Sequence, residues 1–270
     1  MQGADAVVNC VGILAQHGKN TFETVQAEGA ERVARIAAAQ NVGQIVHISA
    51  IGANADSNSE YARTKARGEA AVLEHMPGAI ILRPSIVFGT EDQFFNRFAS
   101  MTRFGPVLPV VGAETRFQPV YVDDVAQAAE LALSGDVASG VYELGGPDER
   151  KFRSLMEMML GVIRRRRLIV NIPFWVARLM GFGFEIANKL TLGLLPAQIT
   201  RDQVYNLAAD NVVAEGANGF AELGIEPVAM DAVLPEYLYR FRPSGQYDAC
   251  LLYTSPSPRD QRGSRMPSSA

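Results

Sequence analysis

Residues 44–89 read QIVHISAIGANADSNSEYARTKARGEAAVLEHMPGAIILRPSIVFG, and the order of apolar and polar segments in this stretch decides the fold. It begins with a short apolar run that ends in Ser49 and continues through a loop rich in Gly, Asn, Asp and Ser. A helical pattern follows from Ser59 to His75, and a second apolar run, Ala79 to Pro84, closes the unit. Strand, loop, helix and strand in this order predict one βαβ crossover of a parallel sheet.

Tyr61 and Lys65 carry the chemistry of this unit. Residues four apart share one face of a helix, so the Tyr61 hydroxyl and the Lys65 ammonium can point into one pocket. A free tyrosine has a pKa near ~10, and a nearby cation lowers that pKa. We therefore expect the pair to exchange a proton with a carbonyl or an alcohol. As a bare pattern, Tyr-x-x-x-Lys is more often a solvated helix face.

The context of the pair favours a site. One strand ends at Ser49, and the next ends at Pro84 and Ser85. In an open α/β sheet, ligands bind outside the carboxyl ends of the strands, so these residues converge with the helix that carries Tyr61 and Lys65. His47 lies inside its strand, and we predict a packed histidine, not a base.

Composition limits the class of protein. The chain has 270 residues and a net charge of −4, which argues against a general nucleic-acid binder. Cys10 and Cys250 form neither a disulfide framework nor a zinc spacing, so we expect no metal site. No uninterrupted apolar run reaches the ~18 residues of a membrane span. We expect a cytoplasmic protein, with peripheral attachment to the inner face of the cytoplasmic membrane as an alternative.

The first residues read as a central strand, and the elements that usually precede such a strand are not found before it. Residues 6–12, AVVNCVG, are typical of a buried parallel strand that ends in a turn glycine. A dinucleotide-binding domain usually opens with a strand and a glycine-rich turn, and that fingerprint is absent here. We therefore expect a chain that lacks the first βα units of such a domain. Residues 20–40 then form a helix, with Asn41 and Gly43 at its end.

Several segments beyond Gly89 are predicted to be structural. The phenylalanines of Asp92 to Arg103 favour a core helix. Phe104 to Gly112 reads as a Pro- and Gly-rich loop, and Asp123 and Asp124 read as the N-cap of a helix. Gly140 to Glu143 reads as the last strand, and Phe152 to Ile163 reads as a helix.

The C-terminal third contains a basic run and an apolar segment. Arg164 to Arg167 is typical of a solvated face, with contact to acidic lipid headgroups as the alternative. Pro173 to Phe184 is apolar nearly all round, which favours burial in a small lobe over a membrane surface. Thr200 and Gln203 form the capping-box pattern of a further helix, and a final helix begins at Met230. Residues 243–270 are rich in Ser, Pro and Arg, resemble translated adapter sequence, and are expected to be disordered.

The Tyr61–Lys65 unit resembles the short-chain dehydrogenase/reductase superfamily in its extended or atypical branch. The resemblance implies that Tyr61 is the catalytic-type tyrosine and that Lys65 holds the cofactor ribose. It also implies that the nicotinamide end is lined by Pro84, Ser85, Val87 and Phe88, and that the ribose side is lined by Asn9, Val11 and Gly12. In extended members a Ser or Thr beyond the strand steadies the substrate oxygen. Here Ala50 and Ile51 stand at those places. Ser49 is the candidate substitute, and a cap of the strand end is the alternative role for it.

Three C-terminal runs narrow the resemblance. Residues 200–204 (TRDQV), 210–213 (DNVV) and 223–227 (LGIEP) are similar to bacterial relatives of the nucleotide-binding accessory subunit of respiratory complex I. This implies bound NADP or NAD, and complex I subunits or a membrane surface as further partners. The implied fold is a Rossmann-like doubly wound parallel sheet lacking its first βα units. We expect a partial nucleotide-binding domain over 1–150, with a substrate-lobe loop at about 90–118, and a helical lobe over 151–242.

Three functions remain open at this point. The first is an NAD(P)-binding subunit associated with complex I or with quinone-linked metabolism. The second is an active NAD(P)H-dependent oxidoreductase or epimerase that uses Tyr61, Lys65 and Ser49. The third is a membrane-surface binding module. The choice between NAD and NADP depends on residues after the second strand of such a domain, which we do not find here.

Overall fold

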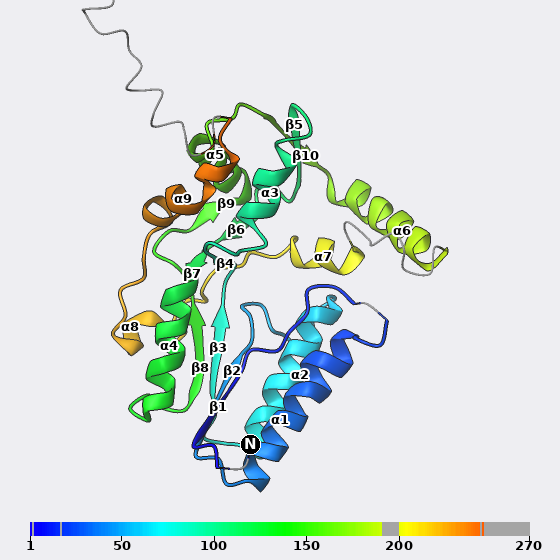
Figure 1. Ribbon diagram of the computed structural model, residues 1–270. Helices are drawn as coiled ribbons and strands as arrows, with labels where there is room; N and C mark the ends of the chain where they lie inside the picture. Colours follow the sequence, from blue (N-terminus) through cyan, green and yellow to red (C-terminus); the bar gives the residue numbers. More distant parts are fainter. Residues whose placement is uncertain (2, 17, 191–199, 244, 246–270) are drawn as a thin grey trace, which may run out of the picture.

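The structure is a computed structural model, and it describes residues 1, 3–16, 18–190, 200–243 and 245 (Figure 1). Most of the segment 243–270, which we expected to be disordered, lies outside the described residues.

A four-stranded parallel sheet forms the centre of the molecule. Its strands are β1 (Ala6–Asn9), β2 (Gln44–Ile48), β3 (Ile80–Pro84) and β8 (Gly140–Leu144), in the spatial order β1-β2-β3-β8. Every neighbouring pair is parallel, with Val46 opposite Val8 on one side and opposite Ile80 on the other. The predicted α/β fold with a parallel sheet is confirmed.

Alternate side chains of the strands pack against helices on opposite faces of the sheet. Ile45 and Ile81 contact the face covered by α1 (Glu28–Ala39) and α2 (Glu60–His75). Val46, Ile80 and Leu82 contact the face covered by α4 (Val122–Ser134) and the short α8 (Phe220–Leu223). Because both faces are covered, the strands carry apolar residues on both faces, as their sequence indicated. A π-helical turn, η1 (Glu23–Ala27), leads into α1.

The ends of α2 agree with its sequence signals. The Ser59 hydroxyl accepts a hydrogen bond from the Ala62 amide at 3.3 Å, so Ser59 is the N-cap. The helix ends at His75, immediately before the Met76-Pro77-Gly78 turn. The predicted helix from Ser59 to His75 is thereby confirmed.

The remaining elements lie beyond the carboxyl end of the sheet and build a second core (Figure 1). They are β4 (Val87–Phe88), α3 (Phe95–Met101), β5 (Val107–Val111), β6 (Arg116–Phe117), β7 (Val120–Tyr121), β9 (Arg150–Lys151), α5 (Phe152–Val162), β10 (Leu168–Ile172), α6 (Phe174–Leu190), α7 (Arg201–Asn206), α9 (Met230–Leu238) and η2 (Tyr239–Phe241). Phe95, Phe117 and Phe152 are buried together there, which confirms the predicted core role of the aromatic helix. Strand pairs β4–β7, β5–β10 and β6–β9 connect these elements.

Several predictions about this region are wrong. Gly140 to Leu144 is not the last strand, since β9 and β10 follow it. The expected loop at Phe104 to Gly112 contains β5, which pairs with β10 over five residues on each side. The loop was expected because prolines and glycines weaken the local strand signal, whereas a partner strand 61 residues away supplies the hydrogen bonds.

The aspartate pair and the arginine run also differ from expectation. Tyr121, not an aspartate, is the N-cap of α4, and no side chain caps this helix end. Asp124 is instead buried and accepts a hydrogen bond from the Val228 amide at 2.8 Å. In the arginine run, Arg165 donates to the Phe241 carbonyl and Arg167 donates to the Thr102 carbonyl, so these two side chains hold loops together and are only half exposed.

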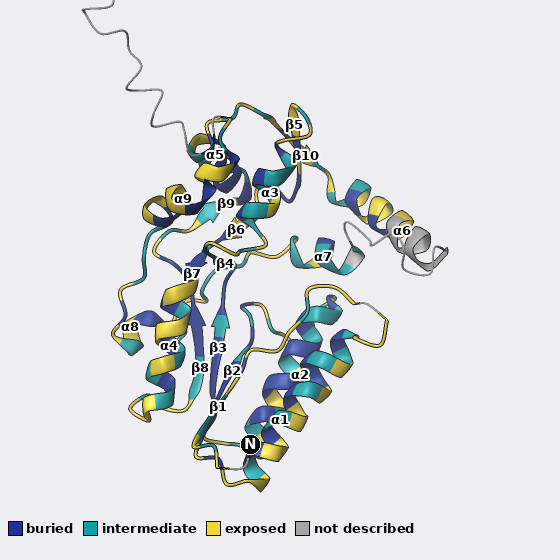
Figure 2. Cartoon of the chain, in the orientation of Figure 1, coloured by how far each residue is buried: buried dark blue, intermediate teal, exposed yellow. Residues whose placement is uncertain are grey.

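Helix α6 is the largest departure. The segment was expected to be buried because it is apolar nearly all round. In the structure Ala177 is buried, whereas Trp175 and Leu179 are 68% and 65% exposed. Figure 2 shows α6 projecting from the rest of the chain, with exposed residues in its first, described half. Among the described residues, no helix is both long and apolar enough to cross a membrane.

Candidate functional site

The site lies where β1, β2 and β3 end. Hydrogen bonds continue past the strands at this edge: Ser49 donates its amide to the Leu82 carbonyl at 2.7 Å, and Ile51 donates to the Pro84 carbonyl at 3.1 Å. After β2 the chain passes through a loop with two turns before it enters α2. This brings the first turn of α2, with Tyr61, to the carboxyl end of the sheet, as the βαβ pattern predicted (Figure 1).

Lys65 reaches the end of the sheet from α2. Its side chain is buried, and its ammonium donates a hydrogen bond to the Ile48 carbonyl at 3.1 Å. A Cβ atom added at Gly12 would lie 3.4 Å from the Lys65 Nζ, so Gly12 and Lys65 are direct neighbours. Burial lowers the pKa of Lys65, and the nearby Glu69 carboxylate partly opposes this shift. An ammonium has three donors, so Lys65 retains capacity for an anionic or hydroxyl ligand.

Tyr61 does not have the environment that the spacing suggested. Its ring packs edge-on against Phe22, with ring centroids 5.7 Å apart. Burial raises the pKa of Tyr61 to about 12. The predicted lowering of this pKa by Lys65 is therefore wrong, because loss of solvent around the phenol outweighs the effect of the cation. Tyr61 is a neutral hydrogen-bond donor at neutral pH.

Ser49 is buried beside these groups, and its hydroxyl has no hydrogen-bond partner within the described part of the chain. Buried hydroxyls normally have a partner, so an orphaned one at a strand end indicates a place for an absent ligand or water. The residues present therefore fit a ligand with hydroxyl or phosphate oxygens, to which Ser49 and Lys65 would donate.

His47 is packed as predicted. Its Nδ1 lies 3.0 Å from the Asn9 side-chain nitrogen, and the Asn9 side-chain oxygen in turn accepts from the Val11 amide at 3.2 Å. Burial, with a smaller effect of the Lys65 charge, lowers the pKa of His47 from 6.5 to about 4. His47 is therefore neutral at physiological pH. Asn9, predicted to contact the cofactor, has its side chain engaged in holding the turn after β1.

The other predicted cofactor residues lie in different environments. Val11 and Gly12 are exposed at the end of β1, where a ligand has access. Phe88 is fully buried and packs against Phe95 at 6.2 Å between ring centroids, so its side chain belongs to the second core. Pro84 is buried and Val87 is half buried. These positions agree with a site on the β1 and β3 ends that does not include the Phe88 side chain.

Ser85 is held by a residue that sequence reasoning did not single out. Its hydroxyl donates to the Asn211 side-chain oxygen at 2.6 Å, and the Asn211 side-chain nitrogen donates to the Ile51 carbonyl at 3.3 Å. Asn211 thereby connects the segments that follow β2 and β3.

Asp202 is the second such residue. Its carboxylate accepts from the Glu60 amide at 2.6 Å, from the Tyr61 amide at 3.3 Å and from the Ser59 hydroxyl at 3.0 Å. Asp202 and Asn211 fall in the C-terminal runs that carried the resemblance, and this was their only signal in the sequence.

A buried ion-pair network supports the strand side of α2. Arg83 on β3 donates to both oxygens of Glu69, at 2.9 and 2.6 Å, and to Glu143 on β8 at 3.3 Å. Both carboxylates are buried, and the pairing raises the pKa of Arg83. The network fixes α2 to two strands and hence fixes the position of Lys65, which lies one turn before Glu69.

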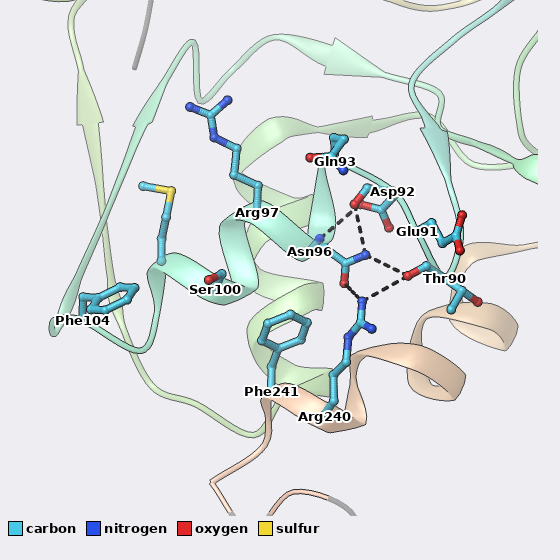
Figure 3. A pocket seen from close by; sticks show the side chains of 11 residues that line it. Thr90, Glu91, Asp92, Gln93, Asn96, Arg97, Ser100, Phe104, Arg240 and Phe241 are labelled. Atoms are coloured by element: carbon cyan, nitrogen blue, oxygen red, sulfur yellow. Dashed lines mark hydrogen bonds between the residues drawn. The ribbon is translucent and has the colours of Figure 1, made fainter. Parts of the chain in front are cut away.

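A cavity of about 750 Å³ lies away from this site, beside α3 and η2. Figure 3 shows Arg240 and Asn96 pointing toward one another in it, and Arg240 donates to the Asn96 side chain at 2.7 Å and to the Thr90 carbonyl at 3.1 Å. None of Ser49, Tyr61 and Lys65 lines this cavity. Its polar groups largely satisfy one another, so the unpartnered Ser49 hydroxyl at the sheet end is the better indicator of a ligand. Among the described residues no cluster of His, Cys, Asp or Glu could hold a metal ion.

Comparison with known proteins gives a consistent picture. Residues 5–158 match the family described as "RmlD substrate binding domain". A mitochondrial protein of Arabidopsis thaliana, named NADH dehydrogenase [ubiquinone] 1 alpha subcomplex subunit 9, is 34% identical over 91% of this chain. A protein of Caulobacter vibrioides named ceramide reductase is 30% identical over 53% of this chain and 44% of its own length.

The match to the Arabidopsis protein covers 62% of that protein's length, so this chain spans less than two thirds of it. Among solved structures, dTDP-glucose 4,6-dehydratase from Streptomyces venezuelae with NAD bound has a TM-score of 0.63. It is 19% identical, and the match covers 94% of this chain and 76% of the dehydratase. At this identity the likeness concerns the fold.

Proposed function

Because the chain belongs to the RmlD substrate binding domain family, within the short-chain dehydrogenase/reductase superfamily, we propose that it binds a nicotinamide dinucleotide, NADP or NAD, at the carboxyl ends of β1, β2 and β3. We further propose that it acts as a nucleotide-binding subunit associated with respiratory complex I or with quinone-linked metabolism. The relative from Arabidopsis, whose name places it in an NADH dehydrogenase, supports this assignment.

One observation carries the proposal: a buried hydroxyl at the sheet end lacks the partner that burial normally requires, beside an ammonium with donors to spare. The Ser49 hydroxyl has no partner in the described part of the chain, and the Lys65 ammonium makes one hydrogen bond, to Ile48. Ribose hydroxyls and a nicotinamide would supply acceptors there. In this arrangement Lys65 holds the ribose, and the exposed residues Val11 and Gly12 leave access for it.

The state of Tyr61 limits the residue to the role of a hydrogen-bond or proton donor. When bound, the nicotinamide ring would supply hydride chemistry. With the pKa of Tyr61 at about 12, the phenol is a donor that orients a ligand, and it is poorly suited to act as a base near neutral pH. The Phe22 ring, packed edge-on against the Tyr61 ring, contributes to this burial.

Calorimetric titration with NADPH and NADH tests the proposal, on this chain and on the longest polypeptide that its gene encodes. Lys65→Met is expected to weaken binding by about 10- to 100-fold, because a charge-assisted hydrogen bond is lost. Lys151→Met, which removes an exposed ammonium paired with Glu114, is the matched control and should leave affinity unchanged. If neither nucleotide binds to either protein, the proposal is wrong.

The second candidate is an active NAD(P)H-dependent oxidoreductase or epimerase, with Tyr61 as proton donor, Lys65 as its tuner and Ser49 on the substrate oxygen. The relative named ceramide reductase favours it. Tyr61→Phe separates the two functions. In a binding subunit this variant should keep its nucleotide affinity, and no turnover is lost because none exists. Nucleotide oxidation by the unmodified protein that disappears in Tyr61→Phe would establish the enzyme.

The exposed side of α6 favours a further role, attachment to a membrane surface. Trp175, Leu179 and Phe182 recur at helical spacing on α6 and are exposed. The basic run Arg164 to Arg167 precedes them and would complement anionic headgroups on the inner face of the cytoplasmic membrane. Flotation with anionic and with neutral vesicles tests this role. Binding that is absent, or that does not depend on anionic lipid, removes it.

A further inference from the structure

Residues 200–214 cross the carboxyl ends of all four central strands. Gln203 donates to the Leu14 carbonyl, beyond β1, at 3.3 Å. Asn211 contacts the segments after β2 and β3, and the Ala214 amide donates to Glu143 on β8 at 2.9 Å. We refer to residues 200–214 as the strap. Figure 1 shows α7, which begins the strap, above the start of α2.

Asp202 joins the strap to the helix that carries Tyr61. A helix leaves its first four amide groups without partners inside the helix. In α2 these are the amides of residues 59–62: the Ser57 side chain accepts from the Ser59 amide, and the Ser59 side chain accepts from the Ala62 amide. The remaining two amides, of Glu60 and Tyr61, both donate to Asp202, which lies more than 140 residues further along the chain. Half of the cap of α2 therefore comes from the strap.

The strap is also packed against α6. Val204 of α7 and Ala177 of α6 are buried in one cluster with Val111. The Arg178 guanidinium lies 5.9 Å from the centre of the Tyr205 ring. A displacement of α6 therefore moves α7, and α7 holds the amide of Tyr61 through Asp202.

We propose that Asp202 is a positioning residue of the nucleotide site, which couples the placement of Tyr61 to the placement of α6. The inference rests on the proposed function, because Tyr61 borders the proposed nucleotide site. Asp202 acts through α2 and does not itself reach the ligand. Its negative charge at the positive end of α2 makes the contact stronger than a neutral cap would.

Asp202→Asn tests the proposal, since the amide keeps the shape but removes the charge and one acceptor. Glu215→Gln is the matched control: Glu215 is an exposed carboxylate just beyond the strap. Hydrogen exchange of the Glu60 and Tyr61 amides, without nucleotide, is expected to become about tenfold faster in Asp202→Asn and to stay unchanged in Glu215→Gln. Unchanged exchange in Asp202→Asn would overturn the role of Asp202 in holding the start of α2.

The coupling has its own readout in Trp175, the single tryptophan of the chain, which lies on α6. Acrylamide quenching of Trp175 is measured with and without NADP⁺ and NAD⁺, whose oxidised rings do not absorb tryptophan emission. The nucleotide is expected to change the quenching constant in the unmodified protein and in Glu215→Gln. In Asp202→Asn this change should be lost while nucleotide still binds. If Asp202 only capped α2, the nucleotide would still change the quenching constant in Asp202→Asn, and that result would overturn the coupling.

Two further results keep the inferences separable. If Asp202→Asn does not fold, Ser59→Ala removes one of the three donors to Asp202 and should give a partial loss of the same quenching change. If the unmodified protein binds neither nucleotide in the calorimeter, the proposed function fails and the coupling to a nucleotide fails with it. The amide exchange of Tyr61 then still decides whether Asp202 holds α2.

Discussion

Helices α2 and α6 have opposite relations between composition and burial. α2 contains six charged residues among 16, yet Lys65 and Glu69 on it are buried. α6 is rich in aromatic and aliphatic residues, yet Trp175 and Leu179 on it are largely exposed. The connection explains the difference. A helix between two parallel neighbouring strands must lie on the sheet, whereas α6 joins β10 to α7 and crosses no sheet.

The comparison teaches that the buried charged side chains of α2 fix the helix to the sheet and thereby support the site. Lys65 and Glu69 are buried because Ile48 and Arg83 on the strands satisfy them. In residues 174–183, the part of α6 whose side chains the structure describes, the apolar face has no comparable set of buried contacts, and this makes it a candidate surface for a partner or a membrane. Four changes would break or sharpen this contrast.

The largest effect is expected at the ion pair beneath α2. Glu69→Ala leaves the Arg83 guanidinium without its bidentate partner, and breaking such a pair should lower the free energy of unfolding by about 3 to 4 kcal/mol. Glu74→Ala, at an exposed position on the same helix, is the control and should change it by less than about 0.5 kcal/mol. Urea denaturation measures both. Equal effects of the two variants would show that burial of charge in α2 does not support the fold.

The next effect concerns pH and the sheet under α2. The pKa of His47 is lowered from 6.5 to about 4, so between these values the unfolded chain binds more protons than the folded one. Stability therefore rises with pH in this window, and it should fall by up to about 3 kcal/mol as pH decreases from 6.5 to 4. His47→Leu should remove most of this dependence. Denaturation curves at several pH values measure it, and a variant with an unchanged pH slope would contradict the assignment.

A smaller effect is expected where α2 meets the turn before α1. A Cβ atom at Gly68 would lie 2.3 Å from the Gln26 backbone oxygen, so Gly68→Ala must push the two helices apart. We expect a loss of about 2 kcal/mol, after allowance for the better helix propensity of alanine. Gly78→Ala, at a site with no atom within 4 Å, is the control. Thermal unfolding distinguishes them, and a stable Gly68→Ala protein would refute the close approach.

The smallest effect on stability is expected on α6. Trp175→Ser and Leu179→Ser remove exposed apolar side chains and should change the free energy of unfolding by less than about 0.5 kcal/mol. Ala177→Leu, at the buried position between them, should cost about 1 to 3 kcal/mol through overpacking. Large destabilisation by the serine variants would mean that the outer face of α6 is covered in solution by another part of the protein.

Much of the site was predictable from local sequence. The cap at Ser59, the turn at Pro77 and Gly78, and the apolar runs of β2 and β3 all act within a few residues, so their pattern predicted strand, helix and strand correctly. The packed state of His47 followed from its place inside an apolar strand. The aromatic segment around Phe95 was predicted as core because phenylalanine is seldom solvated.

The roles of Asp202 and Asn211 were not predictable, because their partners Tyr61 and Ser85 are more than 120 residues away. The pKa of Tyr61 was predicted in the wrong direction for a related reason. The Tyr-x-x-x-Lys spacing supplies a neighbouring cation, but burial by Phe22 and the sheet is a property of the folded chain. Likewise, the apolar composition of α6 predicted burial, although composition does not say whether a surface exists to cover it.

The sequence by itself determined the parallel βαβ unit, the two faces of the sheet, and the placement of Tyr61, Lys65 and Ser49 at one sheet end. These features depend on periodicity and caps, which are encoded by residues close together in the chain. Only the tertiary structure decided which of these groups are buried, which are satisfied, and that α2 is capped from residue 202. Burial, proton affinity and long-range hydrogen bonds depend on contacts between distant segments, and those contacts exist only after the chain has folded.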